Sequence, residues 1–120
     1  MSAEIRLDPG AKEPPYEQIK ASIIELIASG SLPARHRLPS IRQLAGDLGV
    51  APNTVARAYR ELEVDGFVIS RGRRGTTVLT PPAPPPDADD VLDRAVRDAR
   101  RRGLDGPTIL GIVSQALARN

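Results

Sequence analysis

Hydrophobic residues recur at helical spacing in two neighbouring segments between Pro39 and Leu62. In the first segment they fall at i, i+3, i+4 and i+7, and they are Ile41, Leu44, Ala45 and Leu48. In the second segment, the apolar positions that share one helical face are Val55, Ala58, Tyr59 and Leu62. A repeat of this kind predicts two short amphipathic helices that bury their apolar faces in a common core.

Polar and conformationally special residues mark where these two helices begin and end. Ser40 is a suitable N-cap, and Gln43 three residues later completes a capping-box pattern. Gly49 suits the left-handed end of the first helix, and Pro52 suits the first position of the second. The second helix leaves a polar face exposed, and its residues are Asn53, Thr54, Arg57 and Arg60. Two helices joined by a tight glycine turn predict a helix-turn-helix.

The segments on either side complete a small domain. A preceding helix is predicted over 15–29 by apolar residues at helical spacing, which are Tyr16, Ile19, Ile23, Leu26 and Ile27. After the helix-turn-helix, segments 67–71 and 76–80 are rich in β-formers and enclose the basic turn 72–75, which predicts a hairpin. We also expect Arg37 and Leu38 to form a very short strand. The predicted fold class is mainly α with a small β-hairpin, an N-terminal winged helix-turn-helix followed by a short two-helix C-terminal dimerisation tail.

Changes in composition divide the chain into four parts. The first residues show no periodicity and predict an irregular or flexible arm, whereas PPAPPP is a polyproline spacer that separates two folded units. The predicted parts are an N-terminal arm at 1–13, the winged helix-turn-helix at 14–80, a Pro-rich linker at 81–86 and a helical tail at 87–120.

Two amphipathic helices, over 87–102 and 107–119, are predicted in the tail. The tail has about 34 residues, fewer than the roughly 40 below which a unit needs outside help to fold. Its apolar faces must therefore dock elsewhere, and we predict an interchain bundle in a homodimer. The dimerisation residues are Val91, Leu92, Ala95, Val96, Ile109, Ile112, Val113, Ala116 and Leu117. Docking of the tail on its own winged domain is the alternative that stays open.

Composition narrows the functional classes. The chain has no cysteine and a single histidine, His36, which lies between two arginines in a loop. No nucleophile–base pair and no cluster with metal-ligand spacing is visible, so we expect no enzyme, no metal site and no cofactor. No apolar run approaches about 18 residues, and the N-terminus lacks a signal-peptide core. These features predict a cytoplasmic protein without a membrane partner.

Charge adds information through its distribution. The net charge is only +2, from 17 basic and 15 acidic side chains. Between Arg35 and Arg74, however, eight arginines stand against four acidic residues. A local basic surface on a helix-turn-helix predicts double-stranded DNA as partner. We expect Arg42 and Arg57 to contact guanine, and Arg73 and Arg74 in the hairpin turn to contact phosphate or the minor groove.

The segment 14–78 closely resembles the DNA-binding domain of GntR-family bacterial transcription regulators. The matching motifs are YEQIK in the first helix, LPS-x-RQLA at the second, PNTV-x-RAYRELE in the third and GTTV at the end of the wing. PNTV-x-RAY followed by a short helical tail is most similar to the YtrA-type branch. That resemblance implies a homodimeric repressor that binds a pseudo-palindromic operator, often of an operon that encodes an ABC transporter.

The resemblance also implies particular DNA contacts. It points to Arg42, to the polar pair Asn53 and Thr54, and to the wing-tip glycine Gly72. Some branches place arginines at positions 52 and 56, where this chain has proline and alanine, so base contacts from those two positions are not expected. Together with the exposed arginines, the complete expected DNA-binding set is Arg42, Asn53, Thr54, Arg57, Arg60, Arg71, Gly72, Arg73 and Arg74.

Two alternatives remain open at this stage. A winged helix can also serve as a protein-interaction module without specific DNA binding, in which case binding would be insensitive to salt and no duplex would be shifted. An unidentified small-molecule effector between the tail and the winged domain, or at the dimer seam, is the second open point. The sequence identifies neither the effector nor the operator.

Overall fold

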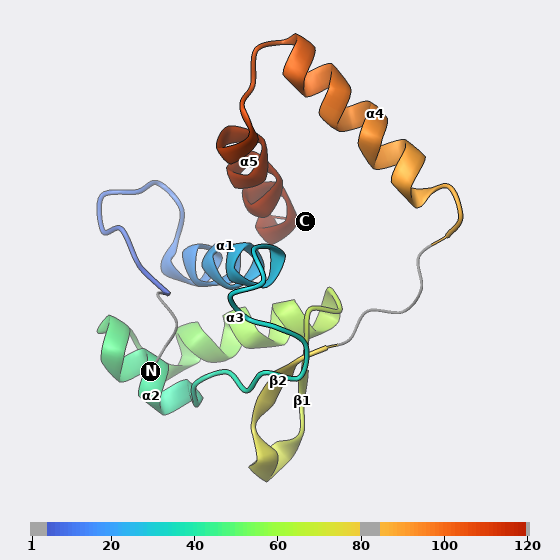
Figure 1. The fold of residues 1–120 in the computed structure, drawn as a ribbon. Coiled ribbons are helices and arrows are strands. Elements are labelled where there is room, and N and C mark those ends of the chain that lie inside the picture. The colour runs from blue at the N-terminus through green and yellow to red at the C-terminus, as the bar shows by residue number, and fades with distance from the viewer. Residues whose placement is uncertain (1–4, 80–84, 120) are drawn as a thin grey trace.

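The computed structural model describes residues 5–79 and 85–119, in which five helices surround or follow a two-stranded antiparallel sheet. Figure 1 shows the chain up to the hairpin forming one body, followed by a helical tail. The elements are α1 (Pro15–Ala28), α2 (Ile41–Leu48), α3 (Pro52–Val64), β1 (Val68–Ser70), a 3-10 turn η1 (Gly72–Arg74), β2 (Thr76–Val78), α4 (Ala88–Arg101) and α5 (Gly106–Arg119). The fold class predicted from the sequence is confirmed, apart from the dimerisation role assigned to the tail. Most of the predicted linker and the first residues of the predicted arm lie outside the described residues.

Local chemistry sets the ends of the helix-turn-helix as predicted. The Ser40 hydroxyl accepts a hydrogen bond from the backbone N–H of Gln43 at 3.1 Å, which satisfies one of the free donors at the start of α2. Gly49 ends α2 with φ at +69°, a left-handed conformation that costs glycine little. Pro52 occupies the first turn of α3. The turn is therefore encoded almost entirely by three residues.

The core lies between α1, α2, α3 and the base of the hairpin. Its most deeply buried large side chains are Ile19, Ile23, Leu44, Leu62, Val55 and Val68. The four apolar positions predicted on α3 are all buried. Tyr59 places its ring in this core and donates its hydroxyl to the carbonyl oxygen of Pro39 at 2.7 Å. Burial raises the pKa of the Tyr59 hydroxyl, so it remains a donor at any physiological pH.

The hairpin carries a third, minimal strand. Val68 pairs with Val78 and Ser70 with Thr76, so alternate residues of both strands share a face. Arg37 forms an antiparallel bridge with Thr77 on the other edge of β2, and the N–H of Leu38 donates to the carbonyl of Thr76 at 2.8 Å. The predicted strand at Arg37–Leu38 is confirmed as this bridge. It anchors the loop before α2 to the wing.

Residues 5–13 belong to the body of the domain. Ile5 is buried in the core, and Leu7 packs against it. The Gln18 side chain fixes this segment from α1, because its amide oxygen accepts from the N–H of Asp8 at 2.7 Å and its amide nitrogen donates to the carbonyls of Asp8 and Glu13. The described part of the predicted arm is thus irregular in backbone but packed.

The two tail helices behave differently. In Figure 1, α5 lies across α1 of the same chain, whereas α4 stands away from the body. Ser114 and Ala118 are the buried residues of α5, and α4 has none. Small residues at this spacing allow two helices to approach closely. Of the two arrangements considered for the tail, docking on its own winged domain therefore holds for α5.

One buried lysine joins α5 to the rest of the domain. Lys20, on α1, is only 2% exposed, and its ammonium donates to Glu61 Oε1 at 2.8 Å and to the carbonyl oxygen of Ala118 at 2.6 Å. Glu61 lies on α3 and Ala118 in the last turn of α5, so three helices meet at one charge. The hydrogen bond from Lys20 is the main reason that the pKa of Glu61 lies below its ordinary value. No helix in the described ranges has both the length and the apolarity needed to cross a membrane.

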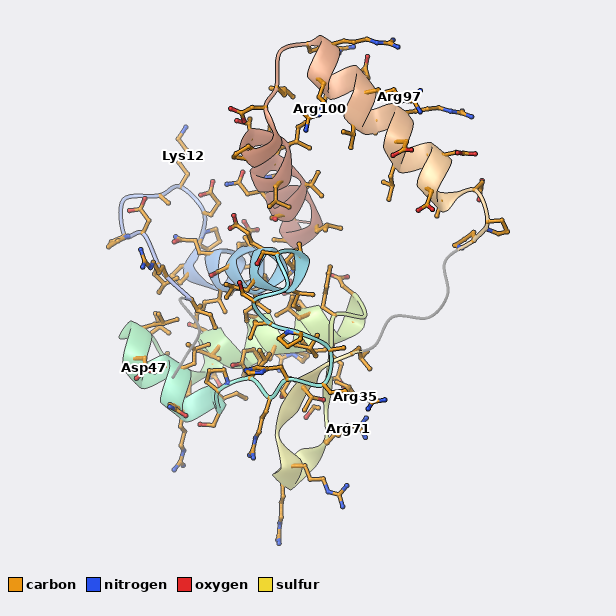
Figure 2. All side chains as sticks on the ribbon, viewed as in Figure 1. Lys12, Arg35, Asp47, Arg71, Arg97 and Arg100 are labelled. Carbon is orange, nitrogen blue, oxygen red and sulfur yellow. The ribbon has the colours of Figure 1, made fainter. Side chains whose placement is uncertain are left out.

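We predict that Lys20→Met destabilises the protein by about 1–3 kcal/mol, because the buried carbonyl of Ala118 loses its donor while the apolar stem is preserved. Urea unfolding measures the loss, and hydrogen exchange should accelerate along α5. Lys12→Met is the matched control, since Lys12 is exposed and points into solvent (Figure 2). If the two variants were equally stable, Lys20 would not fasten the tail.

Candidate nucleic-acid interface

Neighbouring elements cover most of α3 and leave one flank of the helix open. Spacing of three and four residues places Asn53, Ala56, Arg60 and Glu63 along this flank. It opens into a shallow hollow bordered by α2 and by the wing. The residues that line the hollow are Ile41, Ala56, Tyr59, Arg60, Glu63, Ser70 and Thr76. A duplex groove edge would meet α3 here, because the opposite flank is covered by α1.

The wing is attached to this flank of α3. A carboxylate oxygen of Glu63 accepts a hydrogen bond from the backbone N–H of Ser70 at 3.0 Å. The acidic side chain next to the basic surface therefore has a structural partner in β1. This bond ties β1 to the polar flank of α3.

Two of the residues predicted to bind DNA are exposed in the first turns of α2 and α3. Arg42, in the first turn of α2, is exposed and forms no ion pair with any residue in the described ranges. Asn53 is exposed at the start of α3. Thr54 is half-buried, and its backbone N–H is already bonded to the carbonyl of Ala51 at 3.0 Å. Of this polar pair, Asn53 is therefore the more accessible to DNA.

The prediction that Arg57 contacts guanine is not supported, because Arg57 is held on the other flank of α3. Its guanidinium lies 3.7 Å from the centre of the Tyr16 ring, and its Nε donates to Glu61 Oε2 at 3.0 Å. That hydrogen bond raises the pKa of Arg57. Exposure alone suggested a DNA contact, but α1 occupies the space beside this side chain. The Arg57 guanidinium therefore faces α1 and not the hollow beside the wing.

The wing tip is a basic turn whose backbone conformation requires glycine at both ends. Gly72 and Gly75 have φ values of +59° and +84°, and η1 between them carries Arg73 and Arg74, both exposed. Gly75 has ψ at −167°, in a region that is essentially restricted to glycine. A Cβ added to Gly75 would also lie 2.8 Å from Nε of Arg37. The tip thus projects two guanidinium groups without local carboxylates on η1.

Most of the predicted dimerisation residues form an apolar face on the tail. The exposed ones include Val91, Leu92, Ala95, Val96, Ile112, Val113 and Leu117, whereas Ile109 and Ala116 are half-buried. A hollow between α4 and α5 is lined almost entirely by carbon, from Leu92, Ala95, Val96, Ala99, Leu104, Ile109, Ile112 and Val113. The face is therefore on the surface of the single chain.

The sequence did not reveal the residues that dock α5 on the winged domain. Lys20 was hidden in an otherwise apolar stripe, and Ser114 and Ala118 lie outside the apolar face predicted for α5. A signal was present, because Gly111, Ser114 and Ala118 place small residues along one side of α5. Glu63 and Arg37 also shape the interface, and only their contacts with the wing show it.

The helix-turn-helix and its attached wing match a known protein family. The model for bacterial regulatory proteins of the gntR family matches residues 15–78, which is more than half of the chain. This chain belongs to the GntR family. The match spans α1 to the end of β2, so it covers every element of the winged domain.

Similar proteins place this GntR-family chain among the YtrA-type regulators. It is 50% identical over 74 residues to the HTH-type transcriptional regulator Rv1152 of Mycobacterium tuberculosis, and 40% identical over 74 residues to the HTH-type transcriptional repressor YtrA of Bacillus subtilis. Each match covers 62% of this chain, and it covers 61% and 57% of the two relatives. The chain thus matches about three fifths of the length of these curated relatives.

Two solved structures extend the comparison to the fold. YtrA from Sulfolobus acidocaldarius, a GntR-family transcription factor, aligns with a TM-score of 0.62 and 36% identity over 82% of this chain and 99% of its own. The DNA-binding domain of AraR in complex with operator ORE1 aligns with a TM-score of 0.54 and 26% identity, over 63% of this chain and 93% of its own. The chain thus carries the winged domain of a family of DNA-binding transcription regulators, and its named relatives are regulators rather than enzymes.

We predict opposite outcomes for two arginines that lie three residues apart on α3. Arg60→Ala should lower affinity for a specific duplex by about tenfold or more, because Arg60 lines the hollow beside the wing. Arg57→Ala should leave affinity within about twofold, since its side chain faces Tyr16 and Glu61, and should lower the melting temperature instead. Fluorescence anisotropy and thermal unfolding measure the two effects. A larger affinity loss for Arg57→Ala would contradict this assignment of the flanks.

Proposed function

We propose that this chain is a homodimeric repressor that binds a pseudo-palindromic operator. The observation that carries the proposal is the pairing of two surfaces on one folded unit. One is the polar flank of α3 with the basic wing, and the other is the apolar face of α4 and α5. Repression is supported by the relatives, among which YtrA of Bacillus subtilis and the histidine utilization repressors of Pseudomonas are named repressors.

On DNA, α3 enters the major groove with its N-terminal end first. Asn53 and Arg60 face base edges, and Arg42 reaches the same groove from α2. A bidentate arginine–guanine or asparagine–adenine pair discriminates against a wrong base by about 1–3 kcal/mol. The positive end of the α3 dipole favours a phosphate beside Asn53. Arg73 and Arg74 at the wing tip contact the backbone or the minor groove and supply affinity more than specificity.

A second copy of the chain is the occupant that fits the apolar face. Helix α4 has 14 residues and buries none of them in the single chain. An isolated helix of that length is marginal in water, so α4 needs an apolar surface to pack against. Its side chains Leu92 and Val96 and the α5 side chain Val113 present such a surface, and a two-fold axis would bring the same face of a second copy against it.

Dimer symmetry sets the form of the operator. Two copies related by a two-fold axis present two recognition helices in opposite directions, which requires inverted half-sites about one helical turn apart. An apolar small molecule that enters the hollow between α4 and α5 would compete with this packing and change the spacing of the two α3 helices.

Base reading and backbone binding are separable by two substitutions. We predict that Arg42→Ala reduces discrimination between the operator and a scrambled duplex, because it removes a base contact. Arg73→Ala should weaken both duplexes about equally and should lower the salt dependence by about 0.9 in log–log slope for each lost phosphate contact. Anisotropy titrations at several salt concentrations provide both values. Unchanged discrimination in Arg42→Ala would remove Arg42 from the base-reading set.

A charge placed on the apolar face of the tail tests the proposed dimer. We predict that Leu92→Asp converts the protein from two chains to one in light scattering, because a carboxylate would have to be buried in the apolar seam. Operator affinity should then fall by about tenfold or more as the paired binding is lost. Arg97→Glu is the matched control, since Arg97 points away from α5 (Figure 2). A wild-type mass of one chain would refute the homodimer while leaving DNA binding intact.

A further inference from the structure

The outer face of the wing carries three arginines. Ile69 and Thr77 are register partners, so they share the face that points away from α3, and the bridge to Thr77 puts Arg37 on the same face. Arg35 and Arg71 border one shallow hollow there, with Ile69 and Thr77 between them. Figure 2 shows the Arg35 and Arg71 side chains extending to the same side of the hairpin. We call Arg35, Arg37 and Arg71 the outer wing arginines.

These three positive charges are not neutralised by the described part of the chain. All three residues are exposed, and none forms an ion pair with a residue in the described ranges. The sequence that follows β2, residues 80–86, contains no acidic residue either. Like charges on one small sheet face repel one another and oppose folding. All three arginines would therefore favour the binding of an anionic partner.

The backbone at Arg35 adds an independent observation. Arg35 has φ at +71° and is the one non-glycine residue with positive φ among the described residues. This conformation is strained for a residue that carries a side chain, and glycine would avoid the strain. The N–H of Arg35 is tied to the carbonyl of Val78 at 2.8 Å, which fixes the strained residue at the wing. Strained residues of this kind cluster at functional sites.

Arg37 makes the outer face continuous with the wing tip. Its Nε lies 2.8 Å from the position that a Cβ on Gly75 would occupy, so the guanidinium lies directly over the turn after Arg74. The tip arginines and the outer wing arginines therefore form one basic strip. The strip begins where the wing meets DNA and runs along the sheet face opposite to the recognition helix.

We propose that the outer wing arginines bind the phosphate backbone of duplex that flanks the half-site, on the side of the wing away from α3. This inference rests on the proposed operator binding and extends its footprint. Guanidinium groups bind phosphates with charge-assisted, often bidentate hydrogen bonds. The contacts carry no sequence information, so they increase affinity for any flanking sequence provided that duplex is present there.

The test compares two duplexes and two full-length variants. The operator selected from a random pool is prepared either trimmed to its conserved positions or extended by about one helical turn, roughly 10 base pairs, on each side. The double variant Arg35→Gly, Arg71→Ala removes two charges and relieves the strain at position 35. The matched control, Arg35→Lys, Arg71→Lys, preserves the charges. Thermal unfolding of each variant accompanies the titrations.

We expect the wild type to bind the extended duplex more tightly than the trimmed one. The glycine–alanine variant should lose about tenfold or more on the extended duplex and little on the trimmed one, with a smaller salt slope, while its stability does not fall. The lysine variant should retain most of the advantage of the extended duplex.

Three results would overturn the proposal. The first is an unchanged advantage of the extended duplex in the glycine–alanine variant, and the second is an equal loss on both duplexes, which would place these arginines inside the operator. The third is a variant that retains its DNA affinity but no longer binds a polyglutamate peptide, which would assign the surface to an acidic protein. A wild type that binds neither duplex would instead refute the proposed function itself, and the two failures are therefore distinguishable.

Discussion

The packing of α1, α3 and α5 depends on one buried ammonium group. Lys20 reaches Glu61 on the recognition helix and the last turn of α5 at the same time. A lysine taken out of water is costly unless it is paired, and here a carboxylate and a helix C-terminal carbonyl offset that cost. The carbonyl end of α5 is also the negative end of its dipole, which further favours a positive charge.

This contact determines the direction in which the two functional surfaces face. Because Lys20 on α1 bonds to both α3 and α5, the polar flank of α3 and the outer side of α5 belong to one folded body. Helix α5 uses its small residues Ser114 and Ala118 against α1 and leaves Ile112 and Val113 outside. A regulator that works as a pair needs this division, since pairing through the tail then sets the spacing of two recognition helices.

The fold was largely predictable because its signals are local. Ser40, Gly49 and Pro52 determine the helix-turn-helix through capping and backbone conformation, and each acts within about four residues of itself. The β-formers around the glycine turn predicted the wing in the same way. The docking of α5 was left open because it depends on Lys20 and Ala118, which are 98 positions apart in sequence. Its buried residues are small, so hydrophobic periodicity gave no sign of them.

The sequence predicted which residue types form the candidate site, but not which way their side chains face. Helical spacing showed that Arg57 and Arg60 are both exposed on α3, but it could not show that α1 covers one flank. Tyr16 and Glu61 hold Arg57 on that flank, whereas Arg60 opens toward the wing. The outer wing arginines were similarly invisible as a group, since Arg35 and Arg71 meet only when the bridge at Arg37 brings the loop before α2 onto the hairpin. Long-range pairing, rather than residue type, decides which basic side chains share a surface.

We propose that one folded chain joins a DNA-reading flank to a pairing face, so that two chains read one duplex symmetrically. Selection of bound duplexes from a random pool, followed by native mass spectrometry of the full chain on the selected sequence, tests this claim directly. Two chains per duplex on an inverted repeat is the result that this structure predicts. One chain on an asymmetric site would contradict it.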